Sequence, residues 1–160
     1  MRILMIDDSE ARRETLAAHT GAEVVRVMPR ALFDAPEMLH GADAIALDHD
    51  MCEAGDGDAE GDCPFPSTHG GCCCPDGVRV VRWLLERLGT LREGCRIVVV
   101  SANPVGARRM MADLNDPMMR GARKVDVAQC SASNWGRYDS NTRGTVRAAF
   151  GLPLDFEATT

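Results

Sequence analysis

The chain of 160 residues is long enough for one domain with a buried core, and its 45% hydrophobic and 26% charged residues are typical of soluble globular proteins. The net charge of −6 argues against a long nucleic acid as the main partner, because proteins that bind nucleic acids usually carry a basic surface. A small phosphorylated ligand is not excluded, since a local cluster of arginines can outweigh the global charge. No apolar stretch approaches the roughly 20 residues that span a bilayer, so we expect no membrane-spanning helix.

The N-terminus leads directly into a strand-like run, and nothing after it resembles the cleavage region of a signal peptide. We therefore expect a cytoplasmic protein in which the seven cysteines stay reduced. Reduced cysteines act as metal ligands, reactive thiols or core residues rather than as disulfides.

Short apolar runs that are followed by helical patterns predict buried parallel strands. A fold of alternating strands and helices places helices on both faces of one sheet, and a flavodoxin-like strand order of 2-1-3-4-5 brings strands one and three together. We therefore expect a single three-layer α/β domain over residues 1–160. The five predicted strands are Arg2–Ile6, Glu23–Val27, Ala44–Leu47, Arg96–Val100 and Lys124–Ala128.

Capping residues and apolar periodicity predict the helices between these strands. Ser9 is the expected cap of the first helix and Asp76 that of the third, whereas Pro36 interrupts the weaker second helix. Residues 51–75 have no hydrophobic period and form a predicted Cys-, Gly- and Asp-rich insertion after the third strand. The expected helices are Glu10–His19, Arg30–His40, a segment after Asp76 that includes Val78 to Leu88, Val105–Leu114 and Asn141–Phe150.

Acidic residues follow two strands that this order makes neighbours. Asp7 and Asp8 follow the first strand, and Asp48 follows the third. Three carboxylates at one edge would repel one another without a cation, and Mg²⁺ prefers carboxylates together with water and phosphate oxygens. We therefore predict Mg²⁺ or Mn²⁺ at Asp7, Asp8 and Asp48. The alternative is that Asp7 and Asp8 only cap the first helix.

His49 and Asp50 continue the third strand end and are candidates for catalysis together with Asp48. Strand alternation would turn Asp50 to the same side as Asp48 and His49 to the other, although a turn there could bring His49 in instead. The free pKa of a histidine lies near neutrality, which suits a general acid or base. The alternative is a histidine with a purely structural role.

The segment after the fourth strand has the form of a strand end that turns into a helix. Ser101 and Asn103 offer a hydroxyl and an amide, and Gly106 permits close approach of a ligand or another backbone. A helix N-terminus favours an anion, and Arg108 or Arg109 could add a cationic fork for phosphate. These five residues are the predicted phosphate- or substrate-binding set, unless the segment is ordinary helix capping with solvated arginines.

The insertion concentrates cysteine and histidine, which are common ligands of Zn²⁺. Zinc in this segment is one expectation; a loop with free or partly paired thiols is the alternative. Cys95 and Cys130 are expected to be core residues or to line the pocket. The candidate zinc ligands are Cys52, Cys63, His69, Cys72 and Cys74.

The acidic strand ends and the hydroxyl after the fourth strand resemble those of the receiver domains of response regulators. The similarity covers about residues 1–130. Asp7 and Asp8 match the acidic pair of that superfamily, Asp48 its phosphoacceptor and Ser101 its strand-four hydroxyl. The chain departs from the superfamily where it lacks the lysine that ends strand five: Gln129-Cys130-Ser131 stands there, and Lys124 lies too early in the strand. The long insertion is a second departure.

Leu47-Asp48-His49-Asp50, together with 101–107 and Met110 or Met111, resembles the cyclic-phosphate-processing branch of receiver-like domains. This resemblance implies metal or catalytic positions at Asp8, Asp48, His49 and Asp50, with Ser101 and Asn103 facing the phosphate.

The sequence favours a divalent-metal-dependent phosphoesterase, a phosphoric ester hydrolase acting on a cyclic-phosphate or nucleotide-derived small molecule. Lowering of the pKa of a metal-bound water would supply the nucleophile. Two alternatives remain: a phosphoacceptor receiver that serves as an interaction module in signalling, and a non-catalytic zinc-containing binding protein.

Overall fold

The computed structural model describes residues 1–51, 76–121, 125–131, 135 and 140–154. Within these ranges, five parallel strands form one sheet in the order β2-β1-β3-β4-β5, which confirms the α/β fold and strand order expected from the sequence. The strands are β1 (Arg2–Ile6), β2 (Glu23–Val27), β3 (Ala44–Leu47), β4 (Arg96–Val100) and β5 (Asp126–Cys130).

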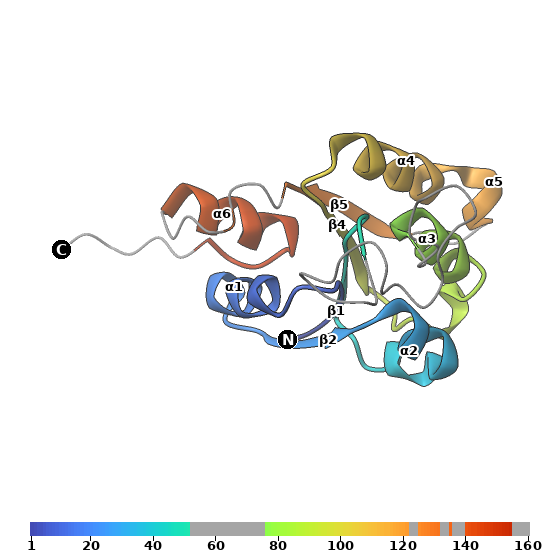
Figure 1. Ribbon diagram of the computed structural model, residues 1–160, viewed down its shortest axis with the longest axis horizontal. Coiled ribbons are helices and arrows are strands. Elements are labelled where there is room, and N and C mark those ends of the chain that lie inside the picture. Colours follow the sequence, from blue (N-terminus) through green and yellow to red (C-terminus); the bar gives the residue numbers. More distant parts are fainter. Residues whose placement is uncertain (52–75, 122–124, 132–134, 136–139, 155–160) are drawn as a thin grey trace, which may run out of the picture.

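Helices cover both faces of this sheet, so the domain has three layers (Figure 1). None of the helices in the described ranges is long and apolar enough to cross a membrane. The helical elements are α1 (Glu10–Thr20), α2 (Pro29–Asp34), η1 (Pro36–Leu39), α3 (Gly77–Leu85), η2 (Leu88–Thr90), α4 (Pro104–Asn115), α5 (Pro117–Arg120) and α6 (Ser140–Ala149).

The hydrophobic core has two halves, one on each face of the sheet. Met5 of β1 packs with Leu16 of α1 and Val146 of α6 on one face. The next residue, Ile6, belongs to the other half, which includes Leu84 of α3 and residues of α2 and α4. Because successive side chains of a strand point to opposite faces, a strand covered on both faces must be apolar throughout. This explains the uninterrupted apolar runs of β1, β3 and β4.

The ends of α1 agree with the prediction within one residue. Ser9 Oγ accepts a hydrogen bond from Arg12 N at 3.3 Å, and Gly21 adopts the left-handed conformation, φ 67°, that ends the helix. The predicted helix Arg30–His40 is divided into α2 and η1 at the expected interruption. Pro36 begins η1, since proline has no backbone N–H with which to continue a helix.

Two features near the C-terminal half differ from the prediction. The fifth strand extends to Cys130, beyond the predicted end at Ala128, and its last two pairs are Val99 with Gln129 and Val100 with Cys130. The short helix α5, capped by the Asp116 side chain, was not expected from the sequence. Apart from its first residue, Met51, the predicted insertion 51–75 lies outside the described residues.

Candidate functional site

The three acidic residues meet at the carboxyl edge of the sheet. Asp7 follows β1 and Asp48 follows β3; these strands are paired, and Asp48 N donates a hydrogen bond to Ile6 O at 3.1 Å. Asp7 and Asp48 are only 1% and 2% exposed, and Asp8 is partly buried. One ligand oxygen from each of the three lies within 4.8 Å of the others. The acidic strand ends therefore form one cluster.

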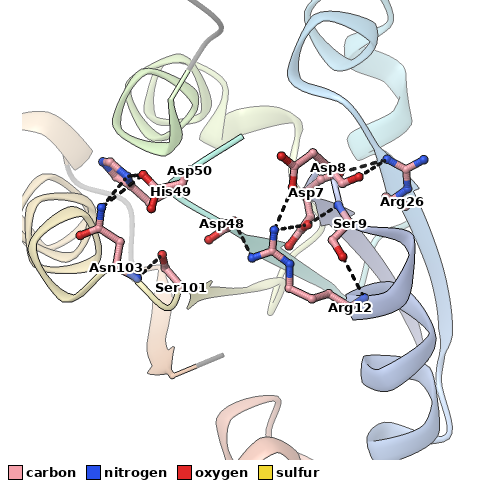
Figure 2. A network of polar contacts seen from close by, with 10 residues as sticks. All are labelled: Asp7, Asp8, Ser9, Arg12, Arg26, Asp48, His49, Asp50, Ser101 and Asn103. Atoms are coloured by element: carbon pink, nitrogen blue, oxygen red, sulfur yellow. Dashed lines mark hydrogen bonds and ion pairs between the residues drawn. The ribbon is translucent and has the colours of Figure 1, made fainter. Parts of the chain in front are cut away.

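Arg12, from the first turns of α1, joins all three carboxylates (Figure 2). One terminal nitrogen of its guanidinium (Nη2) lies 2.9 Å from Asp7 Oδ1 and 2.8 Å from Asp8 Oδ1, and the other (Nη1) lies 2.8 Å from Asp48 Oδ2. Arg12 was not among the site residues predicted from the sequence. The signal was its position four residues after Asp8, a spacing that brings side chains of a helix together.

Burial makes this cluster electrostatically costly. Burial raises the pKa of Asp7 from 3.8 to about 7, aided by the charges of Asp48 and Asp8, although the Ser9 N–H and Arg12 act in the opposite direction. Burial also raises the pKa of Asp48, while Arg12, the His49 backbone and the Ser101 hydroxyl act to lower it. One guanidinium thus does not compensate for the removal of these carboxylates from water.

An oxygen of Asp7 is left over after these contacts. Asp7 Oδ1 accepts a hydrogen bond from Ser9 N at 2.7 Å, but buried Asp7 Oδ2 has no hydrogen-bond partner among the described residues. Within the same described ranges, Asp48 Oδ2 also has no hydrogen bond, and its polar contact is the ion pair with Arg12. Buried carboxylate oxygens without donors suit a hard cation such as Mg²⁺.

A second polar cluster lies on the other side of Asp48, against the first turn of α4 (Figure 2). His49 Nδ1 is 2.6 Å from Asp50 Oδ1, and Asn103 Nδ2 donates to the same oxygen at 3.2 Å. Asn103 also caps α4, because its Oδ1 accepts from the N–H groups of Val105 and Gly106. The cluster is thereby tied to a helix terminus.

The lack of a side chain at Gly106 leaves room for the His49 ring. A Cβ on Gly106 would lie 2.2 Å from both Cγ and Cδ2 of that ring, so no larger residue fits without displacement of the imidazole. Strand alternation predicted opposite sides for His49 and Asp50, but β3 ends at Leu47 and the two side chains meet. The alternative of a turn at this point describes the structure better.

The remaining predicted site residues divide into two groups. Ser101 is buried beside Asp48, and its Oγ accepts a hydrogen bond from Asn103 N at 3.1 Å, which links the two clusters. Arg108 and Arg109 are exposed on α4, and neither forms an ion pair with another residue in the described part of the chain. All five candidate zinc ligands lie outside the described residues.

The end of β5 supplies no cation to Asp48 within the described ranges. Gln129 is exposed, Cys130 is buried and Ser131 is exposed. Lys124 lies outside the described residues. Arg12 is therefore the described cation that contacts Asp48, although it comes from α1 rather than from β5.

The fold and the acidic cluster define a receiver-type domain. A sequence model of the family described as "Cyclic-phosphate processing Receiver domain" matches residues 2–116, which include both polar clusters. The chain belongs to this family. The match ends before β5, so the strand that lacks the lysine lies beyond it.

Solved structures share this fold. A sensor protein from Polaromonas sp. JS666 is similar at 17% identity with a TM-score of 0.52, over 94% of this chain and 95% of that chain. A probable two-component system response regulator/GGDEF domain protein has 17% identity and a TM-score of 0.50, over 83% of this chain and 43% of that chain. Chemotaxis protein CheY4 of Vibrio cholerae has 14% identity and a TM-score of 0.48, over 82% and 86%. No curated protein matches the chain.

Proposed function

We propose that this receiver domain binds a divalent cation at Asp7, Asp8 and Asp48 and accepts a phosphoryl group on Asp48. The observation that carries the proposal is the convergence of three carboxylates within 4.8 Å, with buried Asp7 Oδ2 unpartnered within the described ranges. All donors are hard oxygens, which favours Mg²⁺ or Mn²⁺ over softer metals. When bound, such an ion neutralises the charge that develops on a transferring phosphoryl group.

The residues around Asp48 fit a nucleophilic carboxylate. Burial raises the pKa of Asp48, but Arg12 and the Ser101 hydroxyl act towards its ionised form, and its backbone N–H is fixed to β1. In the transfer, an Asp48 oxygen forms a bond to phosphorus while the bond from phosphorus to the donor's leaving oxygen breaks. With acetyl phosphate as donor, the products are an acyl phosphate on Asp48 and acetate.

Incubation of the full chain with acetyl phosphate and Mg²⁺ tests this proposal. We expect an acid-stable but base- and hydroxylamine-labile phosphoryl adduct, mapped to Asp48 by mass spectrometry. The variant Asp48→Asn should form none, while Asp113→Asn, which breaks an ion pair between α3 and α4, should label normally. If the wild-type protein forms no adduct in the presence of excess Mg²⁺, the proposal is contradicted.

The family description names cyclic-phosphate processing, and the second candidate function is hydrolysis of such a phosphate. The observation that favours it is the cluster of His49, Asp50 and Asn103, which a phosphoacceptor does not require. The contact of Nδ1 with Asp50 favours a tautomer with the proton on Nδ1 and leaves Nε2 to accept a proton from water. Water would then form a bond to phosphorus, one ring P–O bond would break, and a phosphomonoester would result.

A substrate panel separates the two candidates. It contains 2′,3′-cyclic nucleotides and ADP-ribose cyclic phosphates, each incubated with Mg²⁺ or Mn²⁺ and analysed by chromatography. Turnover that disappears in His49→Gln but persists in a surface variant such as Arg82→Gln supports hydrolysis. An unchanged panel rejects this candidate and leaves the phosphoacceptor proposal to its own assay.

A further inference from the structure

The guanidinium of Arg12 holds one oxygen of each carboxylate that would bind a divalent ion. Its contacts with Asp7 Oδ1, Asp8 Oδ1 and Asp48 Oδ2 are 2.9, 2.8 and 2.8 Å long. These residues are also the described group of three carboxylates that can converge on one ion. The arginine and the ion would therefore draw on the same three carboxylates, with Asp7 Oδ2 the oxygen that Arg12 leaves free.

Both cations cannot make these contacts together. Mg²⁺ lies about 2.0–2.1 Å from its oxygen ligands, so an ion on any oxygen that Arg12 contacts would lie against the N–H groups of the guanidinium. Two positive charges at that separation repel each other strongly in a pocket shielded from water. Asp7 and Asp48 are almost fully buried, so solvent does little to screen them.

We propose that Arg12 is the resident cation of this pocket and that a divalent ion binds only when it displaces the Arg12 guanidinium from the carboxylates. The inference rests on the metal site of the proposed function. The Arg12 side chain is 26% exposed, so it has a way out of the cluster towards solvent. Its backbone N–H stays bound to Ser9 Oγ, so only the side chain needs to move. The pocket thus exchanges one internal cation for one external cation.

The affinity for Mg²⁺ alone tests this exchange, without substrate and without turnover. Isothermal titration of the full chain compares wild type with Arg12→Gln, which keeps a polar side chain but removes the competing charge. We expect Mg²⁺ to bind at least about tenfold more tightly to Arg12→Gln, equivalent to about 1.4 kcal/mol. Unchanged or weaker binding would overturn the proposal, since a purely structural arginine would leave the site unaltered or distorted when removed.

The neighbouring arginine provides a matched control. Arg13 is on the same helix, but it pairs with Glu10 and Glu14 rather than with the acidic cluster. Arg13→Gln removes the same charge from the protein and should leave the Mg²⁺ affinity at the wild-type value. An equal gain in both variants would assign the effect to net charge and would reject the exchange.

A measurement on the wild-type protein covers the case in which Arg12→Gln does not fold. The Arg12 Nε–H resonance, assigned through its loss in Arg12→Lys, should shift during a Mg²⁺ titration with the same midpoint as binding. A resonance that stays in place while Mg²⁺ binds would overturn the proposal.

The outcomes also separate this inference from the proposed function. If Asp48 is phosphorylated but Arg12→Gln binds Mg²⁺ no more tightly, only the exchange fails. If Arg12→Gln binds Mg²⁺ more tightly but Asp48 is never phosphorylated, only the phosphoacceptor function fails.

Discussion

Replacement of Asp7 by asparagine should stabilise the metal-free protein at neutral and alkaline pH. The Asp7 side chain is 1% exposed, and burial raises its pKa from 3.8 to about 7. A shift of about 3 units, at about 1.4 kcal/mol per unit, corresponds to a cost on the order of 4 kcal/mol for the ionised carboxylate. Asparagine carries no charge and retains an oxygen that can accept the hydrogen bond from Ser9 N.

The sign of the pH dependence follows from the raised pKa. Between about pH 4 and pH 7 the folded protein keeps the Asp7 proton while the unfolded chain releases it, so stability falls as the pH rises through this window. Above about pH 7 both states are ionised, and the full cost is present. Asp7→Asn should therefore exceed the wild type in stability above neutrality, and the difference should shrink towards about pH 4.

Urea unfolding in EDTA, followed by circular dichroism over a pH series, measures this difference. Asp113→Asn is the control, because it removes a carboxylate from the ion pair with Arg82 between α3 and α4 and should not raise the stability at about pH 8. An Asp7→Asn variant that is less stable than the wild type at about pH 8, or that shows the same pH slope, would refute the reasoning.

Two further predictions concern packing and thiol chemistry. Gly106→Ala should displace the His49 ring and destabilise the protein by about 1–3 kcal/mol in urea unfolding. Gly144→Ala in α6 is the control and should not destabilise the protein, because a new Cβ there would meet nothing nearer than 3.9 Å. Equal effects of the two substitutions would contradict this packing. Burial raises the pKa of Cys95 to about 11 and also raises the pKa of Cys130. Both thiols should therefore resist iodoacetamide in the native protein and react once the protein is unfolded. Rapid labelling of either thiol in the native protein, mapped by mass spectrometry, would contradict their burial.

The sheet and the acidic cluster could be predicted well from the sequence because both depend on simple local patterns. Uniform apolar runs identify strands that are covered on both faces, and parallel strands bring their carboxyl ends to one edge. Asp7, Asp8 and Asp48 could therefore be grouped from the chain order of these runs alone, and the three residues do converge.

Other features depend on tertiary contacts that the pattern does not contain. Arg12 reaches Asp48 across the edge of the sheet, and its spacing from Asp8 is the only local sign of this role. β5 extends through Gln129 and Cys130 because β4 offers backbone partners there, although the apolar run ends earlier. A four-residue helix such as α5 is too short to show helical periodicity.

The orientations of His49 and Asp50 after β3 also could not be predicted from the local sequence pattern. Alternation applies only within a strand, and β3 stops at Leu47, before His49 and Asp50. The His49 ring then fits where Gly106 leaves space, a contact between residues distant in the sequence.

The most direct test asks whether Asp7, Asp8 and Asp48 hold a divalent ion. Anomalous diffraction from crystals of the full chain soaked in Mn²⁺ answers it, because manganese gives a signal that no other atom of the protein matches. We predict a peak within coordination distance of all three carboxylates, with the Arg12 guanidinium moved away from them. Saturating Mn²⁺ that gives no peak at this cluster, with Arg12 still bridging the three carboxylates, would contradict the proposed metal site.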